Sequence, residues 1–163
     1  MEIVIIGIGQ SLRGDDGAGL AAVQHWQRAY PNSANHPSLR IEMVELPGLS
    51  LLDLIFGTSA AILVDAVRSG AKPGTLHLLS ESDLDAFETD SGSAHGVGVA
   101  ESLALGNRLY HERMPADIIL IGVEASGFGV GEILSPEVQR AIPIAARTIE
   151  EQLQNRLNRE IRE

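Results

Sequence analysis

The sequence predicts a three-layer α/β/α domain built around a mostly parallel β-sheet. Apolar runs of strand length alternate along the chain with stretches of helical periodicity, an order typical of α/β proteins. Two of these runs, residues 3–6 and 60–67, contain almost no polar side chain, as expected for strands buried on both faces of a sheet. With 163 residues, the chain is predicted to form one domain over residues 1–163.

The first part of the chain is predicted to form three strands and two helices. Apolar runs mark the strands, apolar residues at helical spacing mark the helices, and proline and glycine mark the breaks. Partial alternation of apolar and acidic residues places the second strand nearer an edge. The expected elements are a strand over residues 3–6, a helix over 18–30, a strand over 39–46, a short helix over 49–56 and a strand over 60–67.

The second part is predicted to form two strands and two helices. A short strand over residues 75–79 follows a Pro-Gly turn, close enough to pair antiparallel with residues 60–67. A helix over residues 96–110, a strand over 117–123 and a final helix complete the series. The final helix begins at Ser135-Pro136-Glu137, a cap followed by a proline and an acid in the first turn, and Pro143 is expected to kink or interrupt it.

Composition excludes several kinds of partner and site. The chain has 12 basic and 22 acidic residues and a net charge of −10, which disfavours nucleic acid and anionic membranes because both bind positive patches. Cysteine is absent, which excludes thiolate nucleophiles, disulfides and thiolate zinc sites. No apolar run approaches the length of a membrane span and the start of the chain lacks a basic leader, so a cytoplasmic location is expected.

The loop after the first strand contains two adjacent acids, Asp15 and Asp16, before a predicted helix. A dinucleotide site here would follow the pattern G-x-G-x-x-G, in which the glycines let a pyrophosphate approach the backbone. Leu12 occupies the third glycine position, and carboxylates beside a diphosphate would repel it. The loop therefore disfavours a nucleotide site.

Three side chains are predicted to share one place in the fold. Asp16 follows the first strand, Asp65 lies near the end of the third, and His95 precedes a helix. Because the carboxyl ends of neighbouring parallel strands border one crevice, we expect these side chains to meet there. Two carboxylates and one imidazole suit a divalent ion such as nickel, zinc or manganese, and they leave a position open for water or substrate.

Each of the three also has a structural interpretation. Asp65 is the only charge in its apolar strand, where it could cap a turn or pair with Arg68. Asp16 could cap the following helix, a role that Asp15 could equally provide. His95 taken alone could be a surface histidine near a helix start. The combination of the three favours a functional site.

The remaining polar residues carry weaker signals. His77, in the short fourth strand, has no metal-binding spacing, and the sequence contains neither H-E-x-x-H nor G-x-S-x-G. Glu124, at the end of the fifth strand, could reach the same crevice, but a structural role is favoured. A serine nucleophile therefore has no support.

These motifs resemble those of the hydrogenase maturation proteases, the endopeptidases that process the large subunit of nickel-iron hydrogenases. The matching stretches occur in family order and are GIGQSLRGDDGAG (residues 7–19), LVDA (63–66), SAH with a following glycine (93–98) and IGVE (121–124). The resemblance implies a twisted, mostly parallel five-stranded sheet of the phosphorylase/hydrolase-like kind, with helices on both faces and one antiparallel strand over residues 75–79.

The resemblance also implies a function. Asp16, Asp65 and His95 would be the catalytic and metal-contacting residues, and they would recognise nickel that the precursor of the large subunit already carries. A short C-terminal extension of that precursor would then be removed. Nickel is thus expected to arrive with the substrate, and no organic cofactor is expected. The alternatives are a non-catalytic metal-sensing or chaperone module on the same scaffold and, less favoured, a nucleotide- or nucleoside-binding protein.

The chain departs from the family pattern at three positions near the expected crevice. Gln10 stands where the family usually has Asn, Gly96 stands where Gln is common, and Ala125 stands where proline is more frequent. These differences leave the three expected site residues intact.

Overall fold

The computed structural model describes residues 2–45, 48–84, 98–127, 129, 131 and 133–160. The strands are β1 (Ile3–Ile8), β2 (Leu39–Val44), β3 (Ala60–Val67), β4 (Leu76–Ser80) and β5 (Asp117–Glu124). The α-helices are α1 (Ala18–Ala29), α2 (Pro31–Ala34), α3 (Ser50–Ile55), α4 (Glu81–Leu84), α5 (Val99–Tyr110) and α6 (Pro136–Glu160). Two 3-10 helices, η1 (Gly14–Gly17) and η2 (His111–Arg113), complete the described elements.

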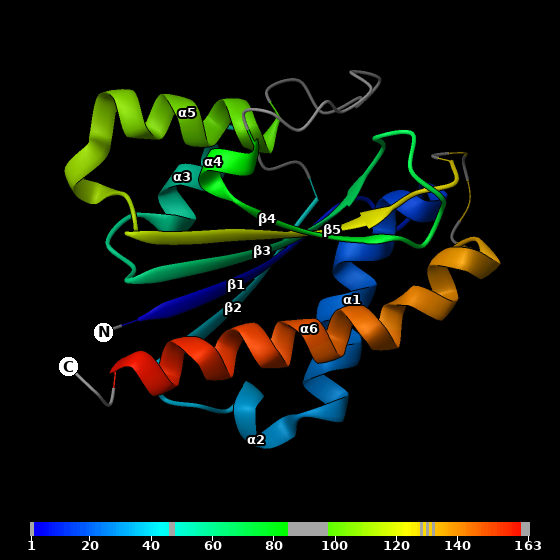
Figure 1. The fold of residues 1–163 in the computed structure, drawn as a ribbon, viewed down its shortest axis with the longest axis horizontal. Helices are drawn as coiled ribbons and strands as arrows, with labels where there is room; N and C mark the ends of the chain where they lie inside the picture. The colour runs from blue at the N-terminus through cyan, green and yellow to red at the C-terminus, as the bar shows by residue number, and fades with distance from the viewer. Residues whose placement is uncertain are drawn as a thin grey trace.

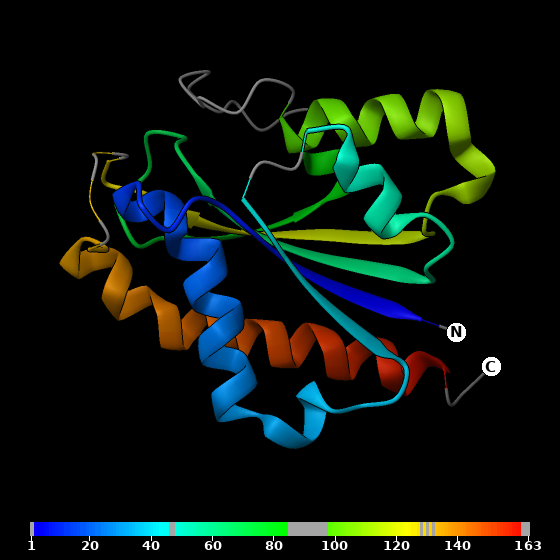
Figure 2. The same ribbon diagram turned by 180° about the vertical axis from the view of Figure 1, so that it is seen from behind.

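The five strands form one sheet between two layers of helices (Figure 1). Their order is β2-β1-β3-β5-β4, with parallel pairing throughout except between β5 and β4. α1 and α6 cover one face of the sheet, and α3 and α5 cover the other (Figures 1 and 2). The predicted three-layer α/β/α architecture with a mostly parallel sheet and one antiparallel strand is confirmed.

Each face of the sheet has its own hydrophobic core. Trp26 and Ile149 fill the core under α1 and α6, and Leu51 and Leu103 fill the core under α3 and α5. β1 and β3 have a neighbouring strand on both sides and contribute to both cores, which explains their nearly continuous apolar sequences. The buried side chains of α1 include Leu20, Val23 and Trp26, which recur every three residues along the helix.

Gly19 lets α1 approach the carboxyl ends of β1 and β3. A Cβ atom at this position would overlap the carbonyl oxygens of Ile8 and Val64. Any other residue would push the helix away from the sheet. Since η1 directly precedes α1, this close contact also holds η1 at the carboxyl edge of the two strands.

The neighbour of β4 differs from the prediction, which paired residues 75–79 with β3. β4 instead pairs antiparallel with β5, which lies between β3 and β4. The connection from β3 crosses the end of β5, where the Gly74 N–H donates to the Glu124 carbonyl at 2.8 Å and the Glu124 N–H to the Thr75 carbonyl at 2.9 Å. A short connection gives a hairpin only when no other strand enters between its arms, and here the largely buried β5 does so.

Smaller differences concern the ends of elements. Residues 31–34, expected only to end the preceding helix, form α2, which begins at Pro31, a residue suited to the first helical position. Pro143 does not interrupt the last helix, because α6 continues through it. The fifth helix begins at Val99 among the described residues. No helix in the described part of the chain is long and apolar enough to cross a membrane.

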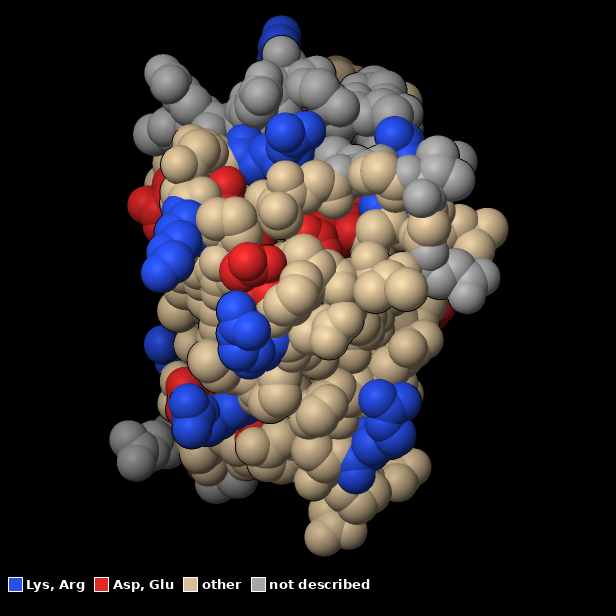
Figure 3. Space-filling model, turned by 90° about the vertical axis from the view of Figure 1, so that its right-hand side faces the viewer, with Lys and Arg blue, Asp and Glu red and all other residues tan. Residues whose placement is uncertain are grey.

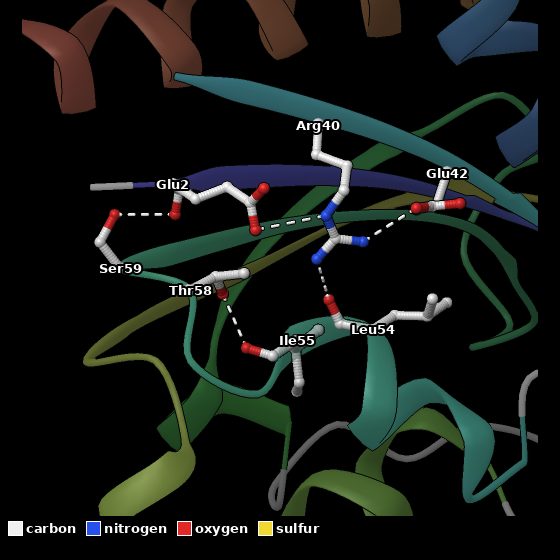
Figure 4. Close-up of polar contacts among 7 residues, drawn as sticks. All are labelled: Glu2, Arg40, Glu42, Leu54, Ile55, Thr58 and Ser59. Carbon is white, nitrogen blue, oxygen red and sulfur yellow. Dashed lines mark hydrogen bonds and ion pairs between the residues drawn. The ribbon is translucent and has the colours of Figure 1, made fainter. Parts of the chain in front are cut away.

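Arg40 fixes the edge strand β2 (Figure 4). Its guanidinium donates to Glu2 at 3.3 Å, to Glu42 at 2.9 Å and to the carbonyl oxygen of Leu54 in α3 at 2.6 Å. Charged side chains along an edge strand discourage pairing with a further strand. This edge of the sheet is therefore protected, and it lies apart from the predicted site residues in β3 and η1.

Candidate functional site

Asp16 lies in η1, at the carboxyl edge of the sheet. The residue is 3% exposed, and its Oδ2 accepts a hydrogen bond from the backbone N–H of Gln10 at 3.2 Å. Gly9 packs against the backbone of Asp16, has a φ of 143° and leaves no room for a Cβ atom. The close contact with Gly9 and the hydrogen bond from Gln10 therefore help to fix where Asp16 lies.

Asp65 lies near the end of β3 and is half-buried. Alternation along the strand puts its side chain on the same face as Leu63 and Val67, the face that α3 and α5 cover. Desolvation raises the pKa of Asp65 well above its ordinary value, the negative charge of Asp16 raises it further, and a hydrogen bond with the Ala66 backbone opposes both. The structure thus brings the first two predicted site residues together.

Two neighbouring carboxylates of this kind favour a bound cation or proton. Their mutual repulsion disfavours the doubly ionised state, and positive charge between them relieves it. Carboxylate oxygens are also suitable ligands for divalent ions. The described pair therefore fits part of a divalent metal site.

His95, the third predicted ligand, lies outside the described residues, so its place beside the pair stays a prediction. Within the described part of the chain, no group of three His, Cys, Asp or Glu side chains could hold a metal ion. Asp16 and Asp65 supply two of the three predicted ligands, and α5, whose capping residue Gly98 follows His95 in the sequence, lies on the face of the sheet that Asp65 shares.

Asp15 has a different role from its neighbour Asp16. It is 2% exposed, and its carboxylate accepts hydrogen bonds from the N–H groups of Ser126 at 2.7 Å, Gly127 at 3.4 Å and Ser135 at 2.6 Å, and from the Ser135 hydroxyl at 2.8 Å. These bonds tie η1 to the loop after β5 and to the start of α6. From the sequence, either Asp15 or Asp16 could cap the following helix. In the structure Asp15 instead connects two loops through its hydrogen bonds, a role that we call the clamp.

The loop after β5 also pairs with the loop before η1. The Gly14 N–H donates to the Gly131 carbonyl at 2.7 Å, and the Gly131 N–H donates to the Leu12 carbonyl at 3.0 Å. Gly14 has a φ of 56°, and a Cβ atom there would lie 3.4 Å from the carbonyl oxygen of Gly127. Glycines in both loops thus allow the close approach that frames the site.

Glu124 holds the segment that follows Asp65 and β3 in the chain. It is 2% exposed, and it accepts hydrogen bonds from the Ser69 N–H and hydroxyl, each at 2.8 Å, with His77 Nε2 at 2.9 Å. Ser69 follows shortly after Asp65, so Glu124 fastens the segment that leaves the site. This agrees with the structural role favoured for Glu124.

His77 contributes to this support, and the sequence interpretation gave it no role. Gly122 of β5 pairs with Asp65 on one side and with His77 on the other, so the two side chains lie in one row across the sheet. The only sequence signal was a polar residue at an inward-facing position of a short apolar strand. That signal is too weak to predict the pair that His77 forms with Glu124.

Comparison with known proteins adds an independent finding. The model of the hydrogenase maturation protease family matches residues 46–152, more than half of the chain. Hydrogenase expression/formation protein HupD of Thiocapsa roseopersicina is 29% identical over 158 residues, which cover 90% of this chain and 68% of HupD.

Solved structures show the same fold. The hydrogenase maturating endopeptidase HybD from E. coli has a TM-score of 0.77 at 23% identity, with 95% of this chain and 93% of that chain covered. The [NiFe] hydrogenase maturation protease HybD from Thermococcus kodakarensis has a TM-score of 0.69 at 26% identity, with 94% and 99% covered. The five-stranded mixed sheet with helices on both sides is thus shared with these proteins.

Proposed function

This chain belongs to the hydrogenase maturation protease family, and we propose that it removes the C-terminal extension from the precursor of a nickel-iron hydrogenase large subunit. The observation that carries the proposal is the proximity of Asp16 and Asp65, which come from separate motifs and share one charged site. The description of the family and the names of the structural neighbours support the same class of enzyme, a peptidase.

We propose further that Asp16, Asp65 and His95 contact nickel carried by the precursor, so that the metal is part of the substrate. Carboxylates and imidazole are ligands that Ni²⁺ accepts. Desolvation is the larger cause of the raised pKa of Asp65, and a cation at the pair would offset the second cause, repulsion by the charge of Asp16. A precursor without nickel would leave that repulsion in place, which gives the site a physical basis for distinguishing loaded from empty precursor.

The reaction is hydrolysis of one peptide bond. The oxygen of water bonds to the scissile carbonyl carbon, the bond between carbon and nitrogen breaks, and the leaving nitrogen takes a proton. A divalent ion beside the scissile bond polarises the carbonyl or the water. A carboxylate of the Asp16–Asp65 pair would accept the proton that the attacking water loses.

The test uses the purified protein and a verified cognate precursor, prepared with and without nickel. We expect mass spectrometry to detect the shortened subunit and the released peptide only with the loaded precursor. Cleavage of neither precursor would contradict the proposal. Binding of the loaded precursor without cleavage would favour the alternative of a metal-sensing or chaperone module on this scaffold.

A further inference from the structure

Two large apolar side chains are exposed at the rim of the site. Ile133 is 80% exposed and Leu12 is 60% exposed. They lie on the two paired loops described above, where the Gly131 N–H donates to the carbonyl oxygen of Leu12 and Ile133 follows shortly after Gly131. Leu12 also precedes Asp16 in the same loop. We call Leu12 and Ile133 the rim pair.

Contacts of described residues hold the chain close to the rim pair. Asp15 binds both ends of the segment after β5 through Ser126 and Ser135, and Leu134, next to Ile133, packs against the core under α1 and α6. The exposure of the rim pair therefore does not come from a frayed end of the chain. Side chains on a fixed backbone need little further ordering when they bind a partner, which favours tight contact.

The surface around the site is suited to a protein partner. Figure 3 looks onto the carboxyl edge of the sheet, where acidic groups lie recessed, with uncharged side chains around much of the recess and basic side chains nearby. A partner that reaches the recess must cover part of the surrounding uncharged surface. Apolar groups at the centre of such a contact contribute most of its binding free energy, and polar groups around them contribute less.

We propose that the rim pair is a docking surface for the precursor and contacts an apolar segment of it next to the scissile bond. The proposal rests on the proposed function, because the precursor is chosen as the partner from the position of Leu12 in the loop that leads into Asp16. Leu12 lies in the segment that leads into Asp16, so we expect a polypeptide that brings a metal to Asp16 to contact this segment. Exposed apolar side chains grouped beside a reactive site mark a contact with a partner, whereas single exposed ones need no explanation.

The experiment compares Leu12→Ser, Ile133→Ser and the double variant with Leu109→Ser. Leu109 is the matched control, because it is 62% exposed and lies near the end of α5, at the opposite end of the sheet (Figure 1). We expect each rim variant to raise KM for nickel-loaded precursor about five- to tenfold. kcat and the melting temperature should stay near wild type, and Leu109→Ser should change nothing.

The dissociation constant of the precursor, measured in parallel, separates this proposal from the proposed function. A wild type that binds the precursor but cleaves nothing would overturn the proposed function, and weaker binding by the rim variants would still support docking. An unchanged KM and an unchanged dissociation constant in the double variant would overturn the docking proposal. A wild-type dimer that the double variant converts to a monomer would also overturn it, since a second copy of the chain would then cover the rim pair.

Discussion

Asp15 accepts two hydrogen bonds from Ser135, one from the backbone N–H at 2.6 Å and one from the hydroxyl at 2.8 Å. Ser135 stands at the start of α6, and its hydroxyl also accepts from the Val138 N–H at 3.4 Å, as expected for a helix cap. The same contact thus caps the last helix and fixes the loop that contains Asp16. The adjacent carboxylates of η1 therefore have different roles. Asp15 holds the loops together, and Asp16 lies beside Asp65.

Asp15→Asn should destabilise the fold. An amide offers one acceptor oxygen and places an NH₂ group against N–H donors, so at least one buried donor loses its partner. We expect a loss of about 2–4 kcal/mol in the free energy of unfolding, measured by urea denaturation. Asp16→Asn is the matched control and should stay near wild type. Equal stability of the two variants would contradict the clamp role of Asp15.

Asp65→Asn should make the folded state more stable near neutral pH. The pKa of Asp65 in the folded chain is raised well above its ordinary value, first by desolvation and then by the charge of Asp16, so the ionised carboxylate lowers the stability of the fold. Below the ordinary pKa of an aspartate the group is protonated in both the folded and the unfolded chain and costs nothing. The cost grows as pH rises from that ordinary pKa to the raised one and is constant above it. The free energy of unfolding of the variant should therefore rise relative to that of the wild type as pH increases from about 3 to about 7.

Urea denaturation of the wild type and of Asp65→Asn across this pH range checks the sign of the difference in their free energies of unfolding. Asp53→Asn, which changes an exposed carboxylate of α3, provides the control for removing one negative charge. A difference between the wild type and Asp65→Asn that is independent of pH, or that matches the control, would show that Asp65 is not destabilised by ionisation.

Asp16→Asn, Asp65→Asn and His95→Ala should each abolish processing of the precursor. The expected reason is loss of a group that contacts the metal or the reacting atoms, so circular dichroism and the melting curve should still show a folded protein. Processing is measured as the appearance of the shortened large subunit on a gel. A variant that processes the precursor at the wild-type rate removes its residue from the site.

Gly19→Ala should disturb both the fold and the site. The added methyl group would overlap the carbonyl oxygens of Ile8 and Val64, so α1 must move away from the sheet and take η1 with it. We expect a loss of stability of about 2 kcal/mol or more, together with loss of processing. Gly127→Ala is the control, because among the described residues, apart from its neighbours in the chain, no atom lies within 4 Å of a Cβ atom built there. Similar effects of both changes would contradict the packing explanation.

Most of the fold could be predicted because its signals are local. The uninterrupted apolar runs of β1 and β3 predict strands buried on both faces, and they are. The partner of β4 could not be predicted in the same way. It depends on β5, which comes later in the chain and enters the sheet between β3 and β4, so the short spacing between those strands was misleading.

The candidate site could be predicted in part. The positions of Asp16 and Asp65 follow from strand ends that meet at one edge, which the sequence shows. The separate role of Asp15 could not be predicted, because its partners Ser126 and Ser135 lie far along the chain. The pairing of His77 with Glu124 likewise depends on the register between β4 and β5.

Two departures from the family pattern have simple structural explanations. The Ala125 N–H donates to the Val67 carbonyl at 2.9 Å, a hydrogen bond that proline at this position could not make. Gln10 contacts Asp16 through its backbone N–H, so this contact does not depend on the side chain that distinguishes Gln from Asn. Gly96, the third departure, lies outside the described residues.

Asp16 and Asp65 are proposed to recognise nickel in the precursor before its tail is cut. The most direct measurement is the rate at which the tail peptide is released under single-turnover conditions, from the same precursor with nickel and without it. We predict release from the loaded precursor by the wild type, none from the empty one, and none from either with Asp16→Asn. Equal rates from loaded and empty precursor, or release by Asp16→Asn at the wild-type rate, would contradict the claim.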